Sequence, residues 1–166
     1  MAELADVMIR EARREDCQAL IDLSREIAHY HKHYDAPQLD VQVLERDIFD
    51  TGHANSGFYV AVHNDDVIGY GHFFYTYTLR LGRNMHLQDL YVKEKFRNHR
   101  IGDKILQAIA KRAVEENITR IEFVVTDWNP AKKFYTRKGA TDKTRVEDFH
   151  FYEFNQTAIR NIAMGN

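Results

Sequence analysis

The stretch His86–Asp103, HLQDLYVKEKFRNHRIGD, decides the predicted fold of this chain. HLQDLYV is rich in the aromatic and branched side chains typical of a strand, and IGDKILQAIAKRAVEEN repeats its apolar residues at helical spacing. The turn between them, KEKFRNHR, is dominated by basic side chains. The unpaired N–H groups of a helix N-terminus, flanked by cations, favour phosphate binding. A basic turn of this kind can equally be a solvated surface feature.

Length and composition are those of an ordinary globular protein. The 166 residues suit one domain spanning 1–166, with 44% hydrophobic and 29% charged residues. A net charge of −2 argues against nucleic acid as the main partner, because that binding needs a strong basic excess. No apolar run has membrane-spanning length and no signal peptide is evident, so a cytoplasmic protein without a membrane partner is expected. The single cysteine, Cys17, excludes an internal disulfide and is predicted to lie in the core.

The remaining elements follow from hydrophobic periodicity and turn residues. Before the decisive stretch, we predict a strand at 7–10, a helix ending near Tyr30, a short helix stopping at 50–52, and a hairpin of strands 58–63 and 67–77. After it, we predict a buried strand at 120–125 parallel to the first, a helix at 131–138 capped by Gly139, two last strands around 142–146 and 149–154, and a C-terminal helix at 155–164.

Two segments resemble a known family. LQDLYVKEKFRNHRIGDKIL (87–106) resembles the acetyl-coenzyme A signature of the GNAT N-acetyltransferase superfamily, and DWNPAKKFYTRKGA (127–140) resembles its second signature. Within it, the chain is similar to the spermidine/spermine (diamine) and thialysine N-acetyltransferases from about Ile9 to Phe154. The resemblance implies an α/β GNAT fold: a mixed six- to seven-stranded sheet, with an antiparallel meander and a central splayed parallel pair, flanked by about four helices. It also implies a homodimer.

The resemblance further implies a site for acetyl-CoA as co-substrate. Tyr135 matches the family's general acid, which protonates the leaving thiolate, although a tyrosine at this place in a helix can also be a core residue. Asn129 matches a coenzyme-contacting asparagine, but its spacing to Tyr135 is six residues (135 − 129) instead of seven. The pantetheine arm is expected between the splayed strands, and the pyrophosphate at the basic turn. The other residues implied in coenzyme binding are Leu90, Tyr91, Val92, Arg97, Asn98, His99, Arg100, Ile101, Gly102 and Asp103.

Two departures from the family pattern concern catalysis directly. Arg100 stands where the family has a glycine, so its side chain either obstructs the pyrophosphate or pairs with a phosphate. Gln88 stands where the polyamine and thialysine enzymes have a glutamate that drains the acceptor's proton, and glutamine cannot accept it. The proton then passes to Asp89, to a water chain, or to His86 if that side chain shares a face with Gln88, or else catalysis is slow.

The predicted acceptor site comprises Tyr30, Thr78, Arg80 and Gln88. Thr78 and Arg80 replace the acid and tryptophan that suit a polycation, and a cation there repels a polyamine. A smaller amine bearing a carboxylate, or an altogether different acceptor, fits better, unless the two arginines of this loop simply face solvent. His29, His31 and His33 lack a further ligand at a supporting spacing, so no metal is predicted.

The predicted function is therefore direct transfer of an acetyl group from acetyl-CoA to a primary amine of a small molecule, either a polyamine or diamine or a thialysine-like amino acid. Direct attack is favoured because no serine or cysteine stands beside a base in the signatures. Two alternatives stay open. One is a catalytically impaired binding or regulatory protein, favoured by Gln88, Arg100 and the shortened spacing before Tyr135; the other is a protein N-acetyltransferase.

Overall fold

A computed structural model describes the chain apart from residues 1–3, 5, 33–38, 51–54, 148–149 and 165–166. The chain divides into two compact units, Met1–Val124 and Val125–Asn166, and each is described by itself. No helix among the described residues is long and apolar enough to cross a membrane.

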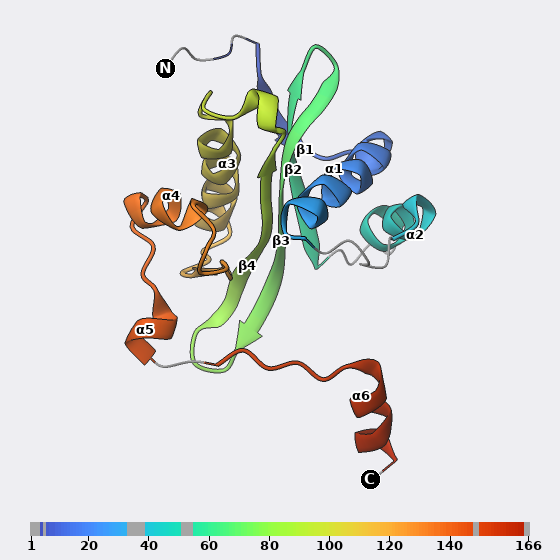
Figure 1. Cartoon of the computed structure of the whole chain (residues 1–166), viewed down its shortest axis with the longest axis vertical. Coiled ribbons are helices and arrows are strands. Elements are labelled where there is room, and N and C mark those ends of the chain that lie inside the picture. The colour runs from blue at the N-terminus through green and yellow to red at the C-terminus, as the bar shows by residue number, and fades with distance from the viewer. Residues whose placement is uncertain (1–3, 5, 33–38, 51–54, 148–149, 165–166) are drawn as a thin grey trace. The chain divides into compact units, whose positions relative to one another are not determined.

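Four antiparallel strands of the first unit form the predicted meander (Figure 1). They are β1 (Met8–Glu11), β2 (Ser56–His63), β3 (Asp66–Thr78) and β4 (Gly82–Val92). The hairpin between β2 and β3 turns at Asn64 and Asp65, which both have positive φ, 49° and 64°. Asparagine and aspartate tolerate this conformation, and two such residues make the tight turn that suits twisted strands. The predicted hairpin is thus confirmed.

A helical crossover connects β4 to a parallel strand. It comprises the short turn η3 (Glu94–Phe96) and helix α3 (Ile101–Glu115), and leads to β5 (Ile121–Glu122). β5 pairs with β4 at two positions, Met85 with Ile121 and His86 with Glu122. β4 continues beyond this pairing to Val92. The predicted parallel pair is therefore confirmed, with a shorter β5 than the expected 120–125.

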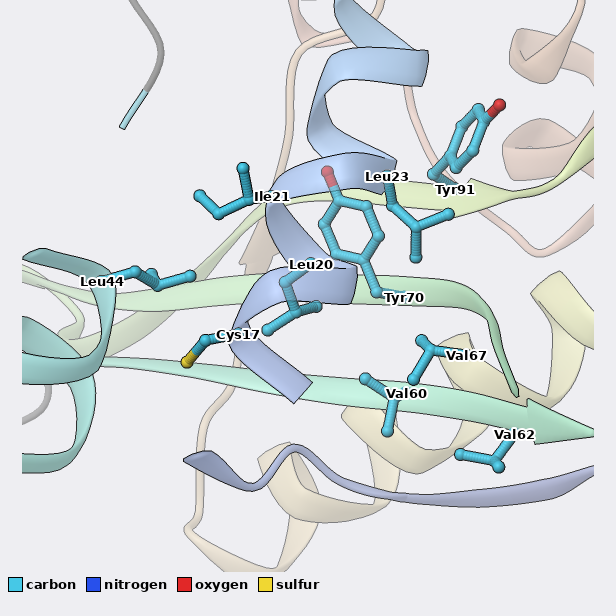
Figure 2. Close-up of a cluster of buried hydrophobic side chains, with 10 residues drawn as sticks. All are labelled: Cys17, Leu20, Ile21, Leu23, Leu44, Val60, Val62, Val67, Tyr70 and Tyr91. Atoms are coloured by element: carbon cyan, nitrogen blue, oxygen red, sulfur yellow. The ribbon is translucent and has the colours of Figure 1, made fainter. Parts of the chain in front are cut away.

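Helices cover both faces of this sheet (Figure 1). On one face lie α1 (Cys17–Tyr30), preceded by the turn η1 (Arg14–Asp16), and α2 (Val41–Glu45), continued by the π-helical turn η2 (Arg46–Asp50). Figure 2 shows the core between α1 and the sheet, where the α1 side chains meet Val60 and Tyr70. Cys17 is buried there, as predicted. On the other face, Ile105 and Ile109 of α3 pack against Gly71, where a Cβ would lie 2.7 Å from each of them.

A bulge interrupts the pairing of β3 with β4. Phe73 lies opposite Leu87 and His72 lies opposite Asp89, so Gln88 is the extra residue of β4. Strand side chains alternate between faces, and a bulge shifts that alternation by one. The condition set for His86 as a proton acceptor, a face shared with Gln88 and Leu90, is therefore not met. The side chains of His86 and Asp89 lie on the α1 face, whereas the side chain of Leu90 lies on the α3 face.

The second unit contains α4 (Ala131–Arg137), α5 (Lys143–Glu147) and α6 (Gln156–Ala163). α6 begins where predicted, because the side-chain oxygen of Asn155 accepts a hydrogen bond from Ala158 N at 2.9 Å. The two last strands, predicted around 142–146 and 149–154, are wrong for the described residues. Lys143 and Glu147 instead pair one turn apart in α5, and 150–154 have no regular structure. The described chain thus holds one mixed five-stranded sheet and six α-helices, instead of six to seven strands and four helices.

A buried ion pair ties β1 to the start of α1. Arg10 donates to both carboxylate oxygens of Asp16, at 2.6 and 3.0 Å, and Arg13 N donates to the same group at 2.7 Å. Burial alone would raise the pKa of Asp16, but the hydrogen bonds and the charge of Arg10 outweigh it and hold this pKa below its ordinary value.

Asp16→Asn is expected to lower the free energy of unfolding by about 2–3 kcal/mol at pH 7, because it leaves Arg10 without its carboxylate. Because the pKa of Asp16 is lower in the folded protein than its unfolded value of 3.8, the ionised carboxylate stabilises the fold above pH 3.8. This contribution is lost as the pH falls from 3.8 through the folded-state pKa. The difference in free energy of unfolding between wild type and Asp16→Asn, measured with urea, should therefore shrink as the pH falls below 3.8. Asp22→Asn, at an exposed pair with Arg25, is the control and should cost less than about 0.5 kcal/mol. Equal costs in both variants would contradict this account.

Candidate functional site

The last residues of β4 expose backbone groups where β5 has diverged. Lys93 N donates to Ile68 O of β3 at 2.9 Å. Successive residues of a strand direct their backbone groups to opposite edges, so Leu90 and Val92 direct theirs away from β3, toward the side of β5. Of the three predicted contacts at this end, Leu90 and Val92 thus present N–H groups to the gap, and Tyr91 presents its own to β3.

The basic turn after β4 leads into the N-terminus of α3. Asn98 and Arg100 both have positive φ, 66° and 60°, and the first helical hydrogen bond runs from Lys104 N to Arg100 O at 3.1 Å. The N–H groups of a helix that precede its first such bond have no carbonyl partner within the helix. With its φ of 60°, Arg100 has the left-handed conformation that glycine adopts most easily. A Cβ added to Gly102 would meet no atom within 4 Å, so space for a ligand borders the backbone there.

Arg97 holds this turn against α1. Its Nε donates to Val92 O at 3.0 Å, and its guanidinium lies 5.4 Å from the ring centre of Tyr30 and 5.5 Å from that of Tyr91. The Tyr91 hydroxyl in turn donates to Glu26 of α1 at 3.0 Å, and burial followed by this bond raises the pKa of Tyr91. Arg97 and Tyr30 therefore lie together and link β4 with the end of α1. An open hollow of about 550 Å³ is lined by Glu26 of α1 and by Lys93, Glu94 and Lys95 of the turn.

Histidines and aromatic rings occupy the α1 face beside the bulge. His86 stacks on Phe74, with ring centroids 4.7 Å apart, and His72 stacks on Phe58 at 4.2 Å. Asp89 Oδ2 lies 3.8 Å from His72 Nδ1, and Gln88 is exposed. Asp89 and His86, two of the predicted proton acceptors, are therefore on one face. His72 was missed by sequence reasoning, because its partners come from neighbouring strands and have no fixed spacing from it along the chain.

The predicted acceptor loop lies at the other end of β4. Arg80 is exposed in the turn between β3 and β4, and Thr78 accepts a hydrogen bond from Leu81 N at 3.2 Å. From Gly82 to Gln88, β4 rises by roughly 20 Å, so the structure does not bring Arg80 next to Gln88. Arg83 from the same loop has a structural role: it lies 3.8 Å from the ring centre of Tyr75 and pairs with Glu116 at 3.1 Å.

Asn129 and Tyr135 belong to the second unit. Asn129 accepts a hydrogen bond from Ala131 N at 2.9 Å through its side-chain oxygen, which caps the start of α4. Tyr135 lies within α4 and packs edge-to-face against Phe134, with ring centroids 5.1 Å apart. The helix ends as predicted, with Gly139 at a φ of 94°.

The three histidines near the end of α1 lie partly outside the described residues, since His33 is among those not described. His29 lies in the last turn of α1 and His31 follows it directly. The described residues contain no group of three or more histidine, cysteine or acidic side chains arranged to hold a metal ion.

Comparison with known proteins gives consistent similarities. A model of the acetyltransferase (GNAT) family matches residues 17–140. The chain is 33% identical over 172 residues to a thialysine N-epsilon-acetyltransferase from Bos taurus, covering 96% of this chain and 99% of that protein. It is 29% identical over 165 residues to a human spermidine/spermine N(1)-acetyltransferase-like protein 1, covering 93% of this chain and 23% of that protein. An integron cassette protein from the mobile metagenome of V. cholerae has a similar fold, with a TM-score of 0.76 at 23% identity over 96% of this chain and 99% of that one.

Proposed function

The chain belongs to the GNAT acetyltransferase family and is an acetyl-transferring enzyme, and we propose that it acetylates a primary amine of a small molecule directly from acetyl-CoA. The observation that carries this proposal is the course of β4. Its last residues continue past the two-residue pairing with β5 and lead into the basic N-terminus of α3. The thioester and the phosphates of acetyl-CoA can thereby contact one continuous stretch of backbone.

The coenzyme's phosphates are proposed to bind at the start of α3. The N–H groups there carry the positive end of the helix dipole, and Asn98 to Asp103 would surround the pyrophosphate. Gly102 permits close approach, since space borders its backbone. Arg100 is exposed at the same turn, where a guanidinium can pair with a phosphate. Arg97 is engaged with Val92 and two tyrosine rings, so its proposed part is to fix the turn.

The transfer step is proposed to use backbone groups of β4 and the hydroxyl of Tyr135. The neutral amine attacks the thioester carbonyl carbon, and the N–H groups of Leu90 and Val92 are proposed to stabilise the oxyanion that develops. The C–S bond then breaks, and Tyr135 donates a proton to the leaving thiolate. Direct attack needs no acyl-enzyme intermediate, and the two signature segments contain no serine or cysteine beside a base that could form one.

The proposed acceptor is an amine that also carries a carboxylate, such as thialysine. The relative from Bos taurus is named for thialysine and is similar to almost the whole chain. Arg80 lies in the turn at the opposite end of β4 from Leu90 and Val92, so the assignment of the acceptor class is supported by this relative alone.

A comparison of two acceptors tests this proposal. With acetyl-CoA at saturation, we expect kcat/KM for thialysine to exceed that for spermidine by at least about tenfold, or roughly 1.4 kcal/mol. A preference for spermidine would contradict the assigned acceptor class, and no transfer to either amine would contradict the proposed function.

A further inference from the structure

Side chains from three neighbouring strands form an array on the α1 face of the sheet. Ser56 Oγ of β2 lies 2.6 Å from His72 Nε2 of β3, and His72 Nδ1 lies 3.8 Å from Asp89 Oδ2 of β4. The ring of Phe58 stacks on the imidazole at 4.2 Å with an interplanar angle of 6°. The bulge at Gln88 creates this array, because it places Asp89 opposite His72.

The array accommodates an imidazole in both protonation states. A protonated imidazole has two N–H donors. Nδ1–H would face the carboxylate of Asp89, and Nε2–H would donate to Ser56 Oγ, whose own hydrogen is directed to Phe73 O at 3.2 Å. In the neutral ring one nitrogen is free to accept a proton. His72 is 23% exposed and Asp89 is 27% exposed, so both are within reach of a polar ligand and of water.

The array lies next to the backbone proposed to bind the thioester. Asp89 directly precedes Leu90, and His72 directly follows Gly71, which pairs with Leu90. Tyr70 of the same face has a buried hydroxyl that makes no hydrogen bond of standard geometry within the described part of the chain. Burial, and then the nearby charge of Asp89, raise the pKa of Tyr70, so it stays a neutral phenol. The Tyr70 hydroxyl therefore lies beside the Asp89 carboxylate, which can accept its hydrogen.

The other side chains beside the bulge are weaker proton acceptors. Gln88 has no basic site, and the carboxylate of Asp89 faces the imidazole of His72. His86 stacks on Phe74, and burial lowers its pKa, an effect that the charge of Glu122 opposes and that His72 reinforces. An imidazole that lies beside a carboxylate and within reach of water can take a proton from a substrate ammonium group.

We propose that His72 accepts the proton of the substrate ammonium, with Asp89 and Ser56 positioning its ring. This inference rests on the proposed function and supplies the proton acceptor that Gln88 cannot be. The substrate nitrogen loses two protons in the reaction. The first passes to His72 and then to water, which frees the lone pair that attacks the thioester carbon. Tyr135 donates a proton to the thiolate released by breaking the C–S bond. The second proton leaves the nitrogen after the C–N bond forms and passes through water to the Tyr135 oxygen, which restores its hydroxyl.

The test compares two acceptors in His72→Gln. Thialysine is largely an ammonium ion at pH 7, whereas 2,2,2-trifluoroethylamine is largely a neutral amine. Loss of the proton acceptor should lower kcat about 100-fold or more with thialysine, the usual contribution of a general base, and less than about threefold with trifluoroethylamine. His63→Gln, the same change at the far end of β2, is the control and should leave both rates unchanged. A structural role for His72 would affect both acceptors alike.

Each outcome is decisive. Equal losses with the two amines, or no loss with thialysine, would overturn the inference while leaving the proposed function in place. Absence of transfer by the wild-type protein to either amine would overturn the proposed function, and the inference with it. If circular dichroism shows that His72→Gln does not fold, Asp89→Asn takes its place: its loss of kcat, about tenfold, should again be confined to thialysine, and an equal loss with trifluoroethylamine would overturn the inference.

Discussion

Replacing Tyr135 with phenylalanine is expected to lower kcat by about 100- to 1000-fold, the usual contribution of a general acid. The substitution removes one hydroxyl and keeps the ring that packs edge-to-face on Phe134, so α4 should be undisturbed. Without a proton donor the coenzyme leaves as a thiolate, which raises the barrier to breaking the C–S bond. Binding of acetyl-CoA does not depend on this proton, so Kd should change less than about twofold. Thiol release and calorimetric titration measure the two quantities.

The matched control is Tyr152→Phe, which removes the hydroxyl of a tyrosine that is 85% exposed in the same unit. It should leave kcat and Kd unchanged. Unchanged turnover in Tyr135→Phe would exclude this residue from the mechanism. It would favour the alternative that Tyr135 is a core residue. A parallel loss of coenzyme affinity would instead assign the hydroxyl to binding.

Reversing the charge of Arg100 is expected to weaken acetyl-CoA binding by about 100-fold. The structure keeps the left-handed backbone at this position, with a φ of 60°, and the side chain is exposed at the N-terminus of α3. A favourable guanidinium–phosphate contact at a partly exposed site contributes about one tenfold step, and Arg100→Glu replaces it with a repulsion of similar size. Arg100→Gly, which removes the charge and suits the backbone, should cost about tenfold. Both losses should shrink as salt is added.

Lys111→Glu is the control for overall charge, because Lys111 lies later in α3 and is 77% exposed. Its effect on Kd should stay below about twofold. A loss as large as that of Arg100→Glu would mean that net charge, and not this turn, determines affinity. Tighter binding by Arg100→Gly would show that the arginine obstructs the pyrophosphate.

Local patterns were sufficient for much of the fold. The Asn64–Asp65 turn defined the β2–β3 hairpin, and helical periodicity defined α1 and α3. The two last strands failed because short alternating segments adopt a strand only when another strand pairs with them. In the described part of the second unit, Lys143–Glu147 is helical instead, and Lys143 pairs with Glu147 one turn later.

The site was predictable where it depends on contiguous residues. The basic turn, Gly102 and the end of β4 follow one another in the chain and are adjacent in the structure. The α1-face array was not predictable, because Ser56, His72 and Asp89 meet through cross-strand pairing and through a bulge. A regular strand would have turned Gln88 toward His86, so the identity of the candidate proton acceptor depends on one extra residue in β4.

The most direct test of the central claim is calorimetric titration of the protein with acetyl-CoA, followed on the same sample by addition of thialysine and detection of free thiol. We predict micromolar binding at one site per chain, and thiol release that starts only when the amine is added. Absence of binding would contradict the proposed coenzyme site. Binding without amine-dependent thiol release would contradict the proposed transfer to a small amine.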